Sequence, residues 1–170
     1  MSLQRPHARS SHVARAAVIS GLCGAILLDL YLVVTEPLIV RGVTPLLVMQ
    51  WDASNLLGMD AYRGGSATAA AGTLLHFCVS IVWGALFVLA ALRIRWVMEH
   101  ALTAGLVLGI VAMTVMRGII HLGYAVVHPF PSFWLFLYIV VGHVVFFGIP
   151  VALVATNLLR AKIVPRQGRA

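Results

Sequence analysis

The sequence predicts an all-α fold, an integral membrane bundle of four transmembrane helices with a short outer interfacial helix between the first and second spans. Two observations lead to this class. Hydrophobic residues make up 61% of the 170-residue chain and charged residues 10%, and the mean hydropathy of +0.99 exceeds what a soluble domain carries. In addition, four apolar stretches meet or approach the ~20 residues that a helix needs to cross a bilayer.

We expect the four spans at about 14–35, 67–92, 100–127 and 133–159. The spans leave room only for short loops, so residues 1–170 are expected to form a single transmembrane domain. The first span follows a basic leader, contains Asp29, and has no small-x-small cleavage pattern after it. These features predict a retained signal anchor rather than a cleaved signal peptide.

The segment between the first two spans has the punctuation of a short helix over about 45–57. Thr44 can cap its start, Pro45 suits the first helical position, and Gly58 fits just past its end. Leucine, methionine and alanine side chains fall on one broad face, with Asp52 and Asn55 opposite. A helix of this length is too short to span, so we expect it to lie in the outer interface.

The basic residues are concentrated at the chain ends and in one loop. Nine of the twelve precede the first span, separate the second from the third, or follow the fourth: Arg5, Arg9, Arg15, Arg93, Arg95, Arg160, Lys162, Arg166 and Arg169. The positive-inside rule therefore predicts that both termini lie in the cytoplasm. Because no aromatic residues alternate with the basic ones, we expect the partner of these tails to be the lipid bilayer and not nucleic acid.

Ionisable residues inside the spans are few and are predicted to gather in the outer half of the bundle. At 1.5 Å per residue, the helical rise brings five of them to similar depths, and we expect them to form a buried polar cluster: Asp29, His76, Arg117, His121 and His143. Asp29 and Arg117 could form a buried ion pair between the first and third spans. Alternatively, they could belong to a ligand or proton site in which Arg117 holds a carboxylate or phosphate.

The membrane histidines allow three interpretations. His76 and His143 could be neutral core residues that hydrogen-bond between helices. They could instead be the two axial ligands of haem b, since they lie at similar depth on the second and fourth spans. In the third interpretation His76, His121 and His128, together with Glu36 or Asp29, bind a divalent metal near the outer mouth.

Motifs for catalysis are missing from the sequence. There is no GxSxG, no HExxH, no glycine-rich phosphate loop and no CxxC pair, so we expect no catalytic residues. Cys23 and Cys78 are predicted to be free thiols that pack as small apolar side chains. The sequence has no internal repeat, so transport of a small solute or of protons would require an oligomer.

Three segments of the chain carry a resemblance to a known family. They are QWDASNLLG (Gln50–Gly58), GGSATAAAGTLLHF (Gly64–Phe77) and GHVVFFGIPVAL (Gly142–Leu153). In these segments the chain resembles small four-span bacterial inner-membrane proteins related to the YagU family, in which a histidine in the second span and a Gly-His pair in the fourth recur. The resemblance implies a location in the bacterial inner membrane and covers His76 and His143, but it implies no catalytic residue. Arg117 and His121 are particular to this chain.

Taken together, these features predict a multi-pass inner-membrane protein with a structural or accessory role, without enzymatic activity, and with a polar pocket in the periplasmic half of the bundle. It could act as a homo-oligomer or as a subunit of a membrane complex, and no cofactor is the first expectation. A redox subunit that binds haem b or a metal through the membrane histidines is the alternative. An oligomeric transporter is the second alternative.

Overall fold

The computed structural model describes residues 6–122 and 133–161, and every regular element in these ranges is a helix. The elements in chain order are α1 (Pro6–Ile39), α2 (Pro45–Leu57), the 3₁₀ helix η1 (Gly58–Arg63), α3 (Gly65–Arg93), α4 (Arg95–Glu99), α5 (Ala101–Leu122), α6 (Phe133–Val141), the π-helix η2 (Gly142–Gly148) and α7 (Ile149–Arg160). The prediction of an all-α fold is confirmed.

Four helical stretches are long and apolar enough to cross a membrane, as predicted: Ser10–Ile39, Gly65–Arg93, Ala101–Gly118 and Phe133–Arg160. The fourth combines α6, η2 and α7. The first helix extends beyond the expected 14–35 at both ends, because hydropathy marks the apolar part of a helix and not its hydrogen-bonded ends. Residues 123–127 of the expected third span lie outside the described residues.

Helix α2 has the bounds that the sequence predicts, and its ends are formed by the expected residues. The hydroxyl of Thr44 accepts a hydrogen bond from the Leu47 amide at 3.3 Å, and Pro45 occupies the first turn. Gly58 ends the helix with a φ of 58°, a conformation that side chains disfavour. Local sequence alone therefore accounts for where this helix starts and stops.

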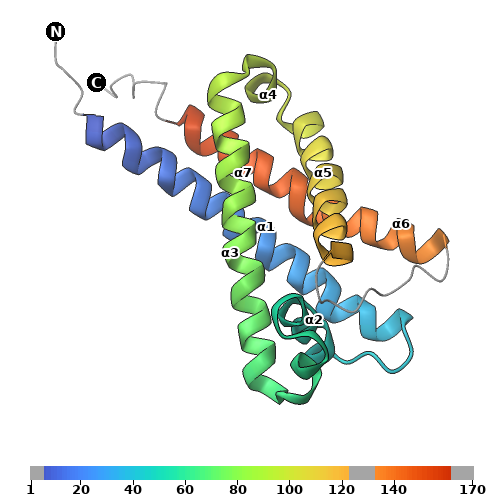
Figure 1. Ribbon diagram of the computed structural model, residues 1–170. Helices are drawn as coiled ribbons and strands as arrows, with labels where there is room; N and C mark the ends of the chain where they lie inside the picture. The colour runs from blue at the N-terminus through green and yellow to red at the C-terminus, as the bar shows by residue number, and fades with distance from the viewer. Residues whose placement is uncertain (1–5, 123–132, 162–170) are drawn as a thin grey trace, which may run out of the picture.

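The long helices form two sets that cross each other obliquely (Figure 1). Helix α1 runs beside α7 over much of its length, whereas α3 and α5 run more steeply across them. The start of α1 and the end of α7 lie on the side of the molecule that carries α4, and His12 Nε2 lies 2.9 Å from the Leu158 carbonyl there. We call this side the α4 end and the opposite side, where α2 packs on α3, the α2 end.

Glycines bring the helix backbones into contact at the crossing points. A Cβ atom on Gly84 of α3 would lie 2.5 Å from the Ala17 carbonyl of α1, and one on Gly21 would lie 2.5 Å from the Ser80 carbonyl. A Cβ on Gly109 of α5 would likewise lie 2.5 Å from the His143 carbonyl. Small residues thus permit the close approach that helices in an apolar surrounding require.

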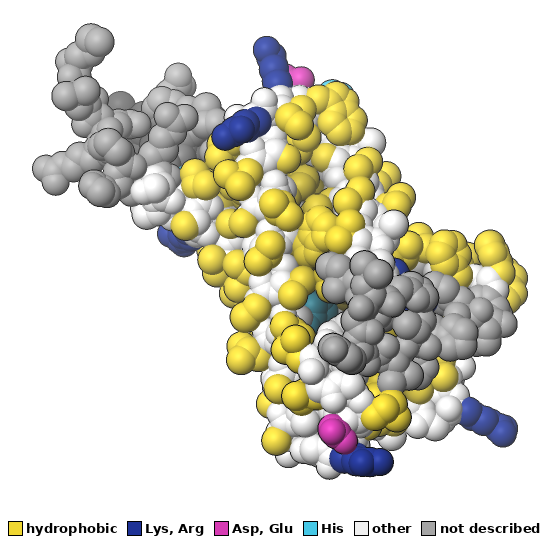
Figure 2. Space-filling model, viewed as in Figure 1, with side chains coloured by type: hydrophobic (Ala, Val, Ile, Leu, Met, Phe, Trp, Pro, Cys, Tyr) yellow, Lys and Arg dark blue, Asp and Glu magenta, His cyan; other side chains and the backbone are white. Residues whose placement is uncertain are grey.

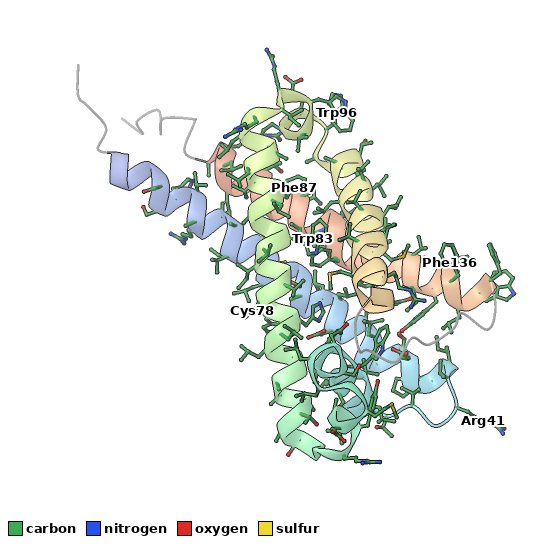
Figure 3. The ribbon with its side chains drawn as sticks, in the orientation of Figure 1. Arg41, Cys78, Trp83, Phe87, Trp96 and Phe136 are labelled. Atoms are coloured by element: carbon green, nitrogen blue, oxygen red, sulfur yellow. The ribbon has the colours of Figure 1, made fainter. Side chains whose placement is uncertain are left out.

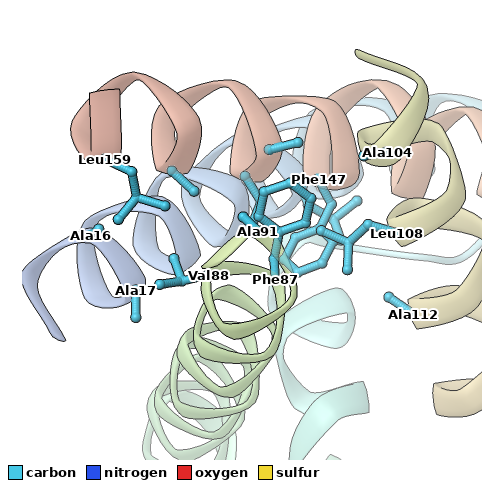
Figure 4. Close-up of a cluster of buried hydrophobic side chains, with 14 residues drawn as sticks. Ala16, Ala17, Phe87, Val88, Ala91, Ala104, Leu108, Ala112, Phe147 and Leu159 are labelled. Atoms are coloured by element: carbon cyan, nitrogen blue, oxygen red, sulfur yellow. The ribbon is translucent and has the colours of Figure 1, made fainter. Parts of the chain in front are cut away.

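Buried apolar side chains fill the contacts among α1, α3, α5 and α7, with Phe87, Val88, Phe147 and Val151 among them (Figure 4). Many of the large apolar side chains instead lie on the outside of the helices. Figure 2 shows them covering much of the visible face between the arginines at its two ends. An all-helical fold with its apolar side chains on the outside is the arrangement that a lipid surrounding favours.

Candidate functional site

A cavity of about 500 Å³ lies among α1, α2, α3, α5 and the fourth span. Most of its wall is apolar, with Leu28, Val79, Met113 and Phe147 as examples. Eight polar or charged side chains also line it, from five different elements: Asp29, Asp52, Asn55, Thr73, His76, Ser80, Arg117 and His143. In Figure 2, histidine atoms are visible in a hollow of the apolar face. A cavity with an apolar wall and a few convergent polar groups is the usual form of a binding site.

The cavity opens sideways, between α3 and α5. Val82 and Leu86 of α3, Val115 of α5 and Leu56 of α2 line it and are between 42% and 71% exposed, so they form its edge among the described residues. Figure 3 places Trp83 on the side of α3 that faces α5, and Cys78 on the opposite side of that helix. Neither cysteine lines the cavity, and both are free thiols.

The polar centre of the cavity is formed by His76 of α3, Asp29 of α1 and Asp52 of α2, which we call the His76 cluster. Nδ1 of His76 is in direct contact with Oδ1 of Asp29 and lies 3.6 Å from Oδ2 of Asp52. One nitrogen and one oxygen from each carboxylate lie within 4.8 Å of one another. The side chains are 13%, 20% and 36% exposed in the order His76, Asp29, Asp52, so the imidazole is the most enclosed.

Asp52 is the member of the cluster that sequence reasoning missed. The sequence pattern predicts that Asp52 and Asn55 lie opposite the apolar face of the helix, but in the structure both residues line the cavity, together with Leu56, while Leu57 is exposed. Partial burial raises the pKa of Asp52 to about 6; His76 opposes this shift and Asp29 adds to it. In an apolar surrounding the polar face of a helix is expected to point into the bundle. Applied to α2, this rule would have predicted that Asp52 faces the other spans.

Two contacts with α3 fix how α2 is rotated. A Cβ atom on Gly72 would lie 2.0 Å from the Met49 carbonyl, so the two backbones touch there. Gln50, whose exposure is 1%, donates from Nε2 to the Gly65 carbonyl at 2.9 Å and to the Thr68 hydroxyl at 3.1 Å. Together these contacts hold Asp52 toward His76.

The ion pair that the structure gives Asp29 is with His76 rather than with Arg117. Asp29 and His76 lie on the helices α1 and α3, which cross at Gly21 and Gly84, whereas Arg117 reaches the cavity from α5. Equal depth along the helices was thus a sound guide to which residues share the cavity, but it could not tell which of them are in contact.

His143 lies on the π-helix η2, and its Nδ1 is 3.0 Å from the Ile139 carbonyl. No local sequence pattern predicts this irregular turn, in which a wider helix brings the His143 carbonyl against Gly109 of α5. Short π-helical segments are rare and are found frequently at functional sites. The structure places His76 and His143 on the wall of one cavity.

The remaining predicted site residues are not brought to the cavity by the described structure. Glu36 lies farther along α1 than Asp29 and is not part of the cavity wall. His121 lies in the last turn of α5, and its side chain is outside what the structure describes, as is all of His128. A metal site that uses His121 or His128 therefore stays a prediction.

Comparison of the chain with protein-family models, with curated proteins and with solved structures found no match. The resemblance to the YagU family stays a prediction from the three sequence segments. The cavity itself is consequently the basis for proposing a function.

Proposed function

We propose that the protein is a multi-pass protein of the bacterial inner membrane that binds a small lipid-soluble ligand in the cavity, in an accessory role rather than as an enzyme. Four apolar helices and an apolar outer surface support the membrane location. Arginines are concentrated at the α4 end (Arg15, Arg93, Arg95 and Arg160), which supports a cytoplasmic position for that end and for both termini. The α2 end would then face the periplasm.

The sideways opening of the cavity is the observation that carries this proposal. Its edge includes apolar side chains in the middle of α3 and α5, at a level where a membrane protein faces acyl chains. A ligand that enters there must be soluble in lipid, and the apolar wall would hold its body. The His76 cluster would hold a polar head group that accepts or donates hydrogen bonds.

The contacts of His76 favour binding over catalysis. In enzymes that use a histidine as general base, the ring contacts a hydroxyl or thiol nucleophile on one side and an orienting group on the other. The ion-pair partners of His76 are two carboxylates, and neither cysteine is part of the cavity wall. The cluster therefore has the character of a polar anchor.

Two valines of α5 allow a matched test of the cavity. Val115 and Val111 are 42% and 43% exposed, yet only Val115 is part of the cavity wall. We expect Val115→Trp to close the opening and Val111→Trp to leave it unchanged. Wild type and both variants would be purified in mild detergent and extracted with organic solvent, and the extract analysed by mass spectrometry.

The proposal predicts a lipid-soluble molecule, other than bulk lipid, that copurifies with wild type and with Val111→Trp and is depleted at least about tenfold in Val115→Trp. Equal amounts in both valine variants, or no such molecule in wild type, would contradict it.

A haem-binding role is the second candidate, and one observation favours it. Nδ1 of His76 lies against a carboxylate and Nδ1 of His143 against a backbone carbonyl. These are the partners that orient ligating histidines and leave Nε2 to bind iron. Haem b bound to purified wild type would give a Soret band that is lost in both His76→Ala and His143→Ala. A colourless protein from haem-replete cells would rule this candidate out.

A further inference from the structure

We infer that the His76 cluster is a binding site for one divalent transition-metal ion, held by His76 Nδ1 and by carboxylate oxygens of Asp29 and Asp52. The donors come from three helices and from positions far apart in the chain, yet they lie within 4.8 Å of one another. Two carboxylates and one imidazole form a mixed donor set and not merely an acidic patch. This site differs from the one predicted from sequence, because it uses Asp52 in place of His121, His128 and Glu36.

The spacing of the donors fits a metal ion between them. Donor atoms at about 2.1 Å from a tetrahedral ion lie roughly 3.4 Å from one another. His76 Nδ1 and Asp52 Oδ2 are 3.6 Å apart, close to this value. The Asp29 oxygen is closer to Nδ1, so its carboxylate would withdraw slightly as the ion entered. The ion would take the place of the proton shared by His76 and Asp29.

The donor types indicate which ions the site would take. Imidazole suits Zn²⁺, Fe²⁺ and Ni²⁺, whereas carboxylates alone suit Mg²⁺ and Ca²⁺. With one nitrogen and two oxygens, and with no thiolate in the cavity wall, the cluster favours Zn²⁺ or Fe²⁺ over Mg²⁺ and over Cu⁺. Three protein ligands leave a coordination position open toward the cavity, which also contains Asn55 and His143.

The test uses purified full-length protein without a polyhistidine tag, stripped with chelator and titrated with Zn²⁺ by calorimetry and with Co²⁺ by visible absorption. We expect one Zn²⁺ per chain, Co²⁺ d–d bands, and affinity lowered at least about tenfold in Asp52→Asn and in His76→Gln. Matched controls are Asp60→Asn and His100→Gln, which change the same residue types at exposed positions outside the cavity. Both should bind like wild type.

Circular dichroism and size-exclusion chromatography would establish that each variant is folded. If His76→Gln does not fold, Asp52→Asn decides, because Asp52 is the least enclosed of the three side chains. Wild type that binds no stoichiometric Zn²⁺, or Zn²⁺ binding that Asp52→Asn leaves unchanged, would overturn the inference. These measurements involve no lipid-soluble ligand, so absence of metal binding would not contradict the proposed ligand-binding function. Absence of a copurifying lipid-soluble molecule would likewise not contradict the metal site.

Discussion

His76 stands between two acids, in a cavity whose wall is mostly apolar. A buried charge in such a place is costly unless a partner offsets it, and removing one partner leaves the other uncompensated. The change in unfolding free energy on mutating one of the two side chains therefore depends on whether the other side chain is present. The contact between His76 and Asp29 is therefore the interaction on which the local structure of the cluster depends most.

A double-mutant cycle on Asp29→Asn and His76→Gln tests this contact. Because the side chains touch, we expect a coupling free energy of unfolding of about 1 to 3 kcal/mol, measured in detergent by denaturant titration. Asp60 and Arg63 provide the control pair, since they are 3.6 Å apart but both 83% exposed. Their coupling should stay below about 0.5 kcal/mol. Additive losses at Asp29 and His76 would show that the two side chains do not interact.

At the scale of single elements, α2 shows what sequence can and cannot predict. Its bounds follow from Thr44, Pro45 and Gly58, which act within one turn of the helix. Its rotation follows from the contacts of Gly72 and Gln50, which join segments separated in the chain. The local pattern therefore predicted the helix correctly, whereas the position of Asp52 depended on tertiary packing.

Mutation of Gln50 tests whether the rotation of α2 depends on its tertiary contacts with α3. Gln50→Leu removes the hydrogen bonds to Gly65 and Thr68 from a fully enclosed site, so we expect a loss of about 1 to 3 kcal/mol in the free energy of unfolding. Leu57→Ala, at an exposed position of the same helix outside the cavity wall, should cost less than about 1 kcal/mol. Denaturant titration of both variants measures the difference. Equal losses would mean that α2 is not held by Gln50.

The π-helix is the second element that the sequence did not predict. A turn of this kind has no local propensity signal, because it is stabilised by what packs on it. Here Gly109 and Gly148 allow α5 to approach η2 so closely that a Cβ on Gly148 would lie 2.3 Å from the Gly105 carbonyl. The change in helix type therefore depends on tertiary packing and not on the local sequence.

At the scale of the whole molecule, composition and hydropathy were enough to predict four spans, because burial in lipid needs only length and apolarity. The helical rise also predicted similar depths for His76, His143, Asp29 and Arg117, and all four line the cavity. The contacts among these residues depend on where the helices cross. The crossing points depend in turn on small residues distributed over several spans. The prediction of both termini in the cytoplasm rests on charge alone.

Cysteine labelling tests that orientation. In a background with Cys23 and Cys78 replaced by alanine, Arg63→Cys and Arg95→Cys introduce thiols at exposed positions of the α2 and α4 ends. We expect a membrane-impermeant maleimide to label Arg63→Cys in intact spheroplasts and Arg95→Cys only after lysis. The reverse pattern would place the α4 end in the periplasm and contradict the proposed topology.

Photocrosslinking can show whether the cavity takes up a small molecule from the surrounding lipid. A photoreactive benzophenone amino acid at Trp83, on the side of α3 that faces α5, is predicted to crosslink a discrete lipid-soluble molecule, seen as a defined mass shift of the intact protein. The same amino acid at Cys78, on the opposite side of α3, should crosslink only bulk phospholipid. Identical phospholipid adducts at both positions, or no adduct at Trp83, would contradict the account.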